Sequence, residues 1–344
     1  MSDDEKLISQ LGLYLSQHFG CDVGIKELSR IPGGASRQTY RFVACYAQGS
    51  ELIERVLILR RDPAFSLIET ERMTEFSAYR AFHKAGLPVP EPIVLELGSA
   101  ALERPFFIME AIEGCSAGSL LAADPYGSHR ELIGQQFWSA LGRIAGSDPI
   151  ALGLGDLERA DDSTQCGLHE LARWEQVIRE DSLEPQPIAL GAIRWLRRHP
   201  PPPPSKLCVV HGDYRSGNFL HDGEGHIRAI LDWEMAHLGD PLEDLAWALD
   251  PLWSHGNPHR PGGMISRDAA LRIWQEESGL VADARALGWW EIFSQVKGLA
   301  IWISAAREFS EGRNTEGVNA FSGLYCTAFH NRTLSERILE LHAS

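Results

Sequence analysis

The sequence predicts an α+β protein with a small, sheet-rich N-terminal part and a larger, mainly helical C-terminal part. A length of 344 residues is enough for about two compact units. Segments with strand character crowd into the first third, and helical hydrophobic spacing dominates after Gly114. The chain is 44% hydrophobic and 23% charged, which is typical of a globular protein and excludes a disordered, collagen-like or coiled-coil chain. We expect two domains, 1–112 and 113–344.

The N-terminal part should contain two helices and a small sheet. Leu7, Leu11 and Leu15 share one helical stripe and predict an opening helix over residues 4–18. A second helix is expected from about Leu67 to Ala85, because a glycine and then a proline follow it closely. The segments with strand character are 25–31, 39–46, 52–60, 93–97 and 105–110.

The C-terminal part is predicted to be helical around one short β-rich segment, residues 207–232. Five consecutive prolines, 200–204, precede this segment and predict an extended spacer of roughly 15 Å, at about 3 Å per residue. The helices expected from hydrophobic spacing are 128–146, 168–181, 186–198, 267–279, 283–310 and 317–342.

The charge balance and the cysteines indicate which partners and which cellular compartment to expect. With 32 basic and 47 acidic residues the net charge is −15, so a nucleic-acid backbone would repel the molecule. Six widely spaced cysteines without a C-x-x-C pair argue against a disulfide framework and favour a reducing cytoplasm. The acidic N-terminus does not resemble a secretory signal, and no apolar run approaches 18 residues. We therefore expect neither a nucleic-acid nor a membrane partner.

The β-rich segment carries the residues with the clearest chemistry. A buried strand, 207–210, leads into a loop with Asp213, and Asn218 follows five residues later. A predicted hairpin then returns the chain to Asp232, so two carboxylates and one carboxamide should converge. Oxygen ligands of this kind favour Mg²⁺ shared with nucleotide phosphates. The spacing therefore predicts phosphoryl transfer, in which a carboxylate accepts the proton of an attacking hydroxyl.

Three motifs link the chain to a known family. They read His-Gly-Asp-Tyr-Arg-x-Gly-Asn at 211–218, Leu-Asp-Trp-Glu at 231–234 and Gly-Asp-Pro-x-x-Asp-Leu-Ala-Trp at 239–247. With them the chain resembles the aminoglycoside phosphotransferase-like branch of the protein-kinase-like fold, in particular the kinase-like domains found alone in bacteria or fused to acyl-CoA dehydrogenases. The resemblance implies a two-lobed fold with an antiparallel-sheet ATP lobe, a helical catalytic and acceptor-binding lobe, and the use of ATP and Mg²⁺.

The resemblance also implies roles for residues of the catalytic lobe. Asp213 would be the catalytic base, and Asn218 and Asp232 would be magnesium ligands. His211 would brace the catalytic loop through hydrogen bonds. Asp240, read from the sequence as a helix N-cap before a proline, would support the active-site loop, and Asp244 would do the same.

In the ATP lobe, the phosphate-binding residues depart from the family pattern. The five lysines of the chain do not end a strand of this lobe, so Arg60 is expected to grip phosphate instead, with Arg61 as the alternative. Glu75 matches the glutamate that pairs with this cation, and Glu71 is the competing choice.

Two further segments would contact the nucleotide. The loop containing Gly33, Gly34 and Ser36 would cover the phosphates, because its glycines let backbone N–H groups approach an anion closely. The segment linking the lobes would place Met109 in the adenine pocket and the backbones of Glu110 and Ile112 against adenine.

Two other functions remain open, as does the acceptor. Members of the family act on aminoglycosides, choline, homoserine or hydroxyacyl compounds, and the sequence does not choose among these hydroxyl-bearing small molecules. The arginine at position 60 leaves room for a nucleotide-binding regulator without turnover. Ser116 lies in a G-x-S-x-G match at 114–118, the nucleophile motif of some hydrolases. That motif needs a parallel sheet, which is not predicted here, so we expect Ser116 to be a linker residue.

Overall fold

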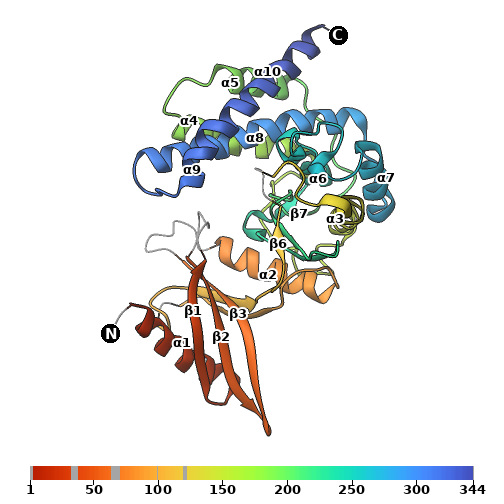
Figure 1. The fold of residues 1–344 in the computed structure, drawn as a ribbon. Coiled ribbons are helices and arrows are strands. Elements are labelled where there is room, and N and C mark those ends of the chain that lie inside the picture. The colour runs from red at the N-terminus through yellow and green to blue at the C-terminus, as the bar shows by residue number, and fades with distance from the viewer. Residues whose placement is uncertain (1–2, 32–37, 63–69, 99, 119–121, 344) are drawn as a thin grey trace. The chain divides into compact units, whose positions relative to one another are not determined.

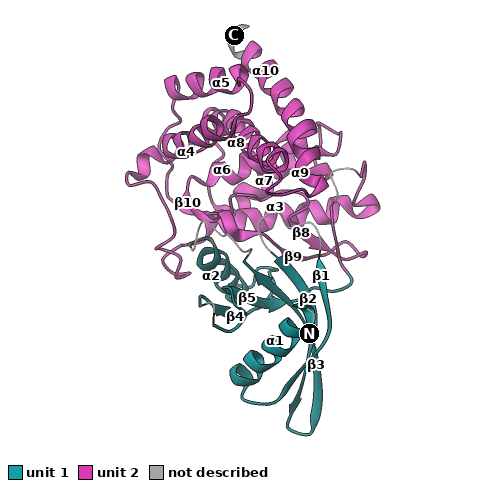
Figure 2. Cartoon of the chain, turned by 90° about the vertical axis from the view of Figure 1, so that its left-hand side faces the viewer, with its two compact units in different colours: residues 1–114 teal, residues 115–344 magenta. Residues whose placement is uncertain are grey.

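The structure is a computed structural model that describes residues 3–31, 38–62, 70–98, 100–118 and 122–343. The chain divides into two compact units, residues 1–114 and 115–344 (Figure 2). We call them the N-terminal and C-terminal units and describe each by itself. This division lies two residues after the boundary expected at residue 112.

The N-terminal unit is built on one antiparallel sheet of five strands in the order β1-β2-β3-β5-β4 (Figure 1). All five strands were predicted, with ends within two residues of those observed. The strands are β1 (Val23–Ile31), β2 (Gln38–Gln48), β3 (Glu51–Arg61), β4 (Pro92–Glu96) and β5 (Phe106–Glu110). The two helices are α1 (Asp3–Phe19) and α2 (Thr70–Lys84).

The two faces of this sheet have different roles. One face carries Phe42, Leu57 and Ile108, which pack in one core cluster with the leucine stripe of α1. Successive strand residues point to opposite faces, so Arg60 and Phe107 lie on the other face. There the Phe107 ring lies 6.0 Å from the Phe76 ring of α2. One face therefore packs against α1, and the other packs against α2 and also carries Arg60.

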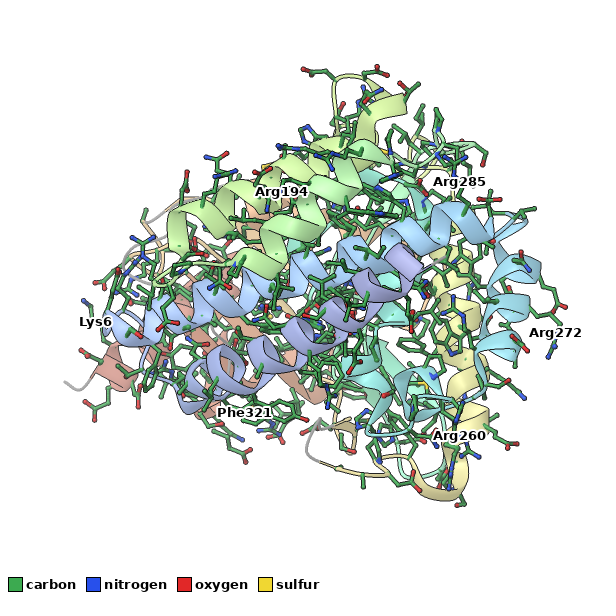
Figure 3. All side chains as sticks on the ribbon, turned by 90° about the horizontal axis from the view of Figure 1, so that it is seen from above. Lys6, Arg194, Arg260, Arg272, Arg285 and Phe321 are labelled. Atoms are coloured by element: carbon green, nitrogen blue, oxygen red, sulfur yellow. The ribbon has the colours of Figure 1, made fainter. Side chains whose placement is uncertain are left out.

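The C-terminal unit is organised around the long helix α8. This helix contacts α4, α5, α6 and α10, while α3 packs against α7 (Figures 1 and 3). The helices are α3 (Arg130–Gly146), α4 (Cys166–Asp181), α5 (Pro187–Arg198), α6 (Pro241–Ala248), α7 (Arg267–Ser278), α8 (Ala284–Ser310), α9 (Gly317–Phe321) and α10 (Thr327–Ala343). The middle of α8 is buried on nearly every side, which accounts for the central position of this helix in the unit.

One predicted helix differs from the structure. The pattern predicts a single helix over 317–342, whereas α9 and α10 are separated by a π-helical turn, Ser322–Cys326. The turn contains Gly323, where a Cβ atom would lie 2.7 Å from the Cβ of Ala306 in α8. Close packing against α8 therefore accompanies the change of helical pitch, which hydrophobic spacing does not reveal.

The β-rich segment forms two small sheets. Strand β7 (Cys208–Val210) pairs with β10 (His237–Gly239), and β8 (Phe219–His221) pairs with β9 (Ile227–Ile230) on one side and β6 (Ser116–Ala117) on the other. The sequence analysis does not predict β6 and β10, which are too short to show an alternating pattern and lie outside the β-rich segment 207–232. Within the part of the chain that the structure describes, none of the helices is long and apolar enough to cross a lipid bilayer.

Candidate active site

The carboxylate of Asp213 is held by three side chains of the C-terminal unit. Its Oδ1 accepts hydrogen bonds from Trp247 Nε1 at 2.8 Å and Arg215 Nε at 3.0 Å. Its Oδ2 accepts from Asn218 Nδ2 at 2.6 Å. Hydrogen bonds to a charged acceptor are stronger than neutral ones, so the orientation of this carboxylate is well fixed. The structure therefore brings together Asp213 and Asn218, which the motif predicts to be neighbours.

His211 and Asp244 brace the loop from within. The Asp244 carboxylate accepts from the backbone N–H groups of His211 at 2.5 Å and Gly212 at 2.9 Å. His211 Nε2 donates to the Leu231 carbonyl at 2.9 Å, and its Nδ1 accepts from the Asp213 N–H at 3.2 Å. Burial lowers the pKa of His211 despite nearby carboxylates, so a neutral ring with Nε2 protonated fits all these bonds. These are the bracing bonds expected of His211.

Asp232 lies at the end of the hairpin that returns to this loop. The β8–β9 register pairs Phe219 with Ile230, and Leu231 N–H donates to the Asn218 carbonyl at 2.8 Å. Asp232, the next residue, therefore follows a position directly opposite Asn218. Its backbone is left-handed, with φ 62° and ψ 60°, which is a strained conformation for a residue with a side chain. Such strain is maintained only where the surroundings fix it, and it is common at functional sites.

Asp240 adopts the predicted capping role. Its side chain accepts from Leu242 N–H at 2.9 Å at the start of α6, and Trp290 Nε1 donates to its other oxygen at 3.1 Å. Burial raises the pKa of Asp240 to about 6, although both hydrogen bonds act in the opposite direction. This residue thus ties α6 to α8, whereas Asp244 holds the loop at residues 211–218.

A buried charge network lies next to the loop. Lys297 Nζ of α8 donates to the Gly212 carbonyl at 2.7 Å and to Glu243 Oε1 at 3.0 Å. Glu243 Oε2 lies 3.1 Å from His237 Nε2, while His237 Nδ1 lies 3.0 Å from the Met235 carbonyl. Burial alone would lower the pKa of His237, but the charge and hydrogen bond of Glu243 outweigh it and raise the pKa to about 9. The positive charges and hydrogen bonds of Lys297 and His237 keep the pKa of Glu243 low despite its burial.

In the N-terminal unit, the structure pairs a candidate phosphate-binding cation with a candidate partner. Arg60 Nη1 lies 2.5 Å from Glu75 Oε1, and Glu75 is fully buried. Arg61 instead donates to Gln38 Oε1 at 2.9 Å. The side chain of Glu71 lies outside the described part of the chain. The geometry thus pairs Arg60 with Glu75, while the choice of Arg60 over Arg61 as the phosphate-binding cation stays a prediction.

The other predicted nucleotide contacts are only partly described. Gly33, Gly34 and Ser36 lie outside the described residues. Met109 is buried in β5, and Glu110 N–H donates to the Glu91 carbonyl at 2.9 Å, so this donor is already used within the unit. Ile112 follows the end of β5. An adenine-contacting role for these residues stays a prediction.

Ser116 does not occupy the position that the hydrolase motif requires. It lies in β6 and pairs with His221 of β8 in antiparallel register. The strand-to-helix turn of a hydrolase nucleophile is therefore not found at Ser116, which lies two residues after the boundary between the two units. Two-residue strands of this kind have no sequence signature.

Sequence reasoning missed three residues that contact the loop: Arg215, Trp247 and Lys297. Arg215 and Trp247 lie inside the motifs at 211–218 and 239–247. There they contribute to the family resemblance, but the motifs do not predict their contacts with Asp213. Lys297 has its own signal, because it is the charged residue among the buried positions of α8. A lysine in an otherwise buried helical segment indicates a partner that the sequence alone does not name.

Comparison with known proteins places this geometry in context. The model of the phosphotransferase enzyme family matches residues 27–280, well over half of the chain. Mouse acyl-CoA dehydrogenase family member 10 is 30% identical over 230 residues, 65% of this chain and 20% of that protein. Rat acyl-CoA dehydrogenase family member 11 is 26% identical over 281 residues, 79% of this chain and 34% of that protein. The chain thus spans between a fifth and about a third of the length of these relatives.

Solved structures show the same fold at low sequence identity. A Ralstonia eutropha protein with a provisional assignment as an aminoglycoside phosphotransferase superposes with a TM-score of 0.74 at 19% identity, covering 96% of this chain and 97% of that one. Aminoglycoside phosphotransferase APH(4)-Ia, in a ternary complex with AMP-PNP and hygromycin B, gives a TM-score of 0.55 at 17% identity, covering 96% and 98%. The fold is therefore the kinase-like fold that the resemblance implies. Together with the family match, it shows that this chain belongs to the phosphotransferase enzyme family.

Proposed function

We propose that this protein transfers the γ-phosphoryl group of ATP to a hydroxyl of a small-molecule acceptor, with Asp213 as the catalytic base. The observation that carries the proposal is the Asp213 carboxylate, oriented by Trp247, Arg215 and Asn218. A carboxylate fixed in this way can orient an acceptor hydroxyl and take its proton as the oxygen attacks phosphorus. Positioning of this kind is the main contribution that a protein makes to phosphoryl transfer.

Asn218 and Asp232 are the residues that would hold Mg²⁺. The Asn218 amide nitrogen points to Asp213, at 2.6 Å from Oδ2 and 2.9 Å from the backbone carbonyl, so its amide oxygen is directed away from that carboxylate. An amide oxygen and a carboxylate at facing ends of a hairpin are a donor set that fits Mg²⁺. When bound, the ion neutralises charge on the nucleotide phosphates.

Arg60 is proposed to contact the nucleotide phosphates, oriented by Glu75. The guanidinium remains charged at all relevant pH values and can bind phosphate oxygens through two parallel hydrogen bonds. Nucleotide complexes of related folds, with AMP-PNP for APH(4)-Ia and with GDP for aminoglycoside 2'-phosphotransferase-IIIa, support the use of a nucleotide.

A cavity of about 690 Å³ in the C-terminal unit is the candidate acceptor site. Tyr325, Phe329 and Arg332 contribute to its lining, as does His255. His255 Nε2 lies 3.2 Å from the hydroxyl of Ser216, three residues after Asp213. The cavity wall is therefore bonded to the catalytic loop. Its mixed aromatic and polar lining suits a small amphipathic molecule with a hydroxyl group.

An ADP-release assay tests the proposal. The purified chain is incubated with Mg·ATP and pools of hydroxyl-bearing metabolites, and phosphorylated products are identified by mass spectrometry. Asp213→Asn is the matched control, because it keeps the size of the side chain and removes its basicity. We expect at least one pool to release ADP with the parent chain and none with the control. Tight Mg·ATP binding without ADP release in every pool would instead favour the nucleotide-binding regulator.

A further inference from the structure

Lys297 is a buried cation whose shortest contact is to the catalytic loop. Its side chain is 2% exposed and lies in α8, far in sequence from the loop motifs. The ammonium donates to the Gly212 carbonyl at 2.7 Å and to Glu243 at 3.0 Å. It also lies 5.4 Å from the Trp247 ring and 5.7 Å from the Trp174 ring, within range of cation–π attraction.

The bond to Gly212 fixes the peptide that precedes Asp213. The carbonyl of this peptide accepts from Lys297, and its N–H donates to His211 Nδ1 at 3.2 Å. Gly212 has φ +86°, and a Cβ atom here would lie 2.5 Å from the Met235 carbonyl oxygen. Both polar groups of the peptide are thus held in a narrow space, so rotation of the peptide would also move Asp213.

The contact with Trp247 gives a second connection to the same carboxylate. Lys297 lies near the ring, and the indole N–H donates to Asp213 Oδ1 at 2.8 Å. Glu243 and Trp247 are four residues apart and therefore share one face of α6. The ammonium consequently contacts the α6 face that orients the Asp213 carboxylate.

A purely structural salt bridge is the simpler interpretation, but it does not account for all of these contacts. A buried Lys–Glu pair often adds little to stability relative to apolar side chains of similar size. Glu243 already has a second cationic partner in His237 at 3.1 Å. The Gly212 carbonyl, by contrast, receives its side-chain donor from Lys297. This arrangement points to a role in the geometry of the loop.

We propose that Lys297 is a positioning residue for phosphoryl transfer, which fixes the Asp213 carboxylate through the Gly212 carbonyl and the Trp247 indole. The expected loss of turnover rests on the proposed function, whereas the expected effect on the orientation of the Asp213 carboxylate does not. Loss of the ammonium should lower the rate of the chemical step by about 100-fold, as expected for a misplacement of roughly 1 Å. The affinity for Mg·ATP should stay within about threefold, because a tenfold change would need about 1.4 kcal/mol and Lys297 is buried among protein groups.

The test uses two variants of the full chain. Lys297→Met removes the charge at similar length but leaves the buried Glu243 carboxylate with one partner fewer. The double variant Lys297→Met with Glu243→Gln removes both charges, and it keeps the proposal testable if the single variant does not fold. Glu175→Gln is the control, since Glu175 is a nearly buried carboxylate whose partners Arg179 and Arg197 lie outside the loop.

The direct readout is the indole N–H signal of Trp247 in the chain labelled with ¹⁵N-tryptophan. The chain has ten tryptophans, and loss of one signal in the Trp247→Phe variant identifies the indole of Trp247. We expect the double variant to shift this signal and to speed its exchange with solvent by at least tenfold, while Glu175→Gln leaves it unchanged. Unchanged exchange of the Trp247 indole in the folded double variant would overturn the proposal.

The kinetic readout is release of phosphate from Mg·ATP with water as acceptor, together with Mg·ATP affinity by calorimetry. A loss of turnover with retained affinity supports the positioning role, and parental turnover in the double variant contradicts it. If the parent chain shows no turnover with water or with any acceptor pool, the proposed function fails. The Trp247 signal still decides whether Lys297 fixes the Asp213 carboxylate, so the two failures are distinguishable.

Discussion

The buried pair Arg60–Glu75 gives the sharpest test of the N-terminal unit. The guanidinium and the carboxylate lie 2.5 Å apart, with 10% and 0% of their side chains exposed. Glu75→Gln leaves a cation buried beside a neutral amide, and removal of one partner of a buried pair costs about 3–5 kcal/mol. The double variant Arg60→Met with Glu75→Met buries no charge and has similar volume, so its stability should lie within about 1.5 kcal/mol of the parent.

Stability and nucleotide binding should separate in these two variants. If Arg60 grips phosphate, Glu75→Gln should weaken Mg·ATP binding by about tenfold, which corresponds to about 1.4 kcal/mol, because the guanidinium loses its orientation. The double variant should be more stable than Glu75→Gln and yet bind Mg·ATP more weakly, since the cation itself is gone. No general destabilisation produces this reversal of order.

The assay can follow the two units separately. All ten tryptophans lie at or beyond residue 138, in the C-terminal unit, so intrinsic fluorescence during urea unfolding reports that unit. Circular dichroism reports both units. Glu75→Gln should lower the urea midpoint seen by circular dichroism more than that seen by fluorescence. A parental urea midpoint together with a parental Kd for Mg·ATP would refute the reasoning, as would tight nucleotide binding by the double variant.

Three further predictions concern the C-terminal unit. Asp213→Asn should reduce phosphoryl transfer by about 10²–10⁴-fold and leave Mg·ATP affinity unchanged, as measured by product formation and calorimetry. Asp232→Ala should abolish the part of nucleotide affinity that depends on Mg²⁺; equal affinities with and without the metal in the parent would contradict this role. Because the pKa of His237 is raised from 6.5 to about 9, its contribution to stability is complete below pH 6.5 and lost as the pH rises through 9. The raised pKa contributes about 3 kcal/mol to the free energy of unfolding, at about 1.4 kcal/mol per pH unit. In His237→Gln the urea midpoint should therefore change less between pH 6.5 and 9 than it does in the parent.

The sequence predicts the elements of the fold well where hydrophobic spacing is long enough to show a period. The five strands of the N-terminal sheet and the helix α8 belong to this class. The short strands β6 and β10 and the π-helical turn before α10 do not, because they depend on pairing and packing between distant segments. Hydrophobic periodicity contains no information about these contacts.

For the candidate site, the motif predicts the proximity of Asp213 and Asn218 because both lie on one loop. The family resemblance names Glu75 as a partner for Arg60, and the structure shows these two side chains in contact. Lys297 could not be placed in the same way. Its contact with Gly212 joins residues 85 positions apart, and only the packing of α8 against α6 brings them together.

The contacts of helix α6 determine which segments would have to be transferred together to rebuild this site in another protein. Within eight residues it presents a cap, two carboxylates and an indole, each bonded to a different neighbour. A deletion of one residue would turn every later side chain by about 100° and break these bonds together. A graft of the loop 211–218 alone would therefore be inert, and the smallest portable unit includes the hairpin, α6 and the facing stretch of α8.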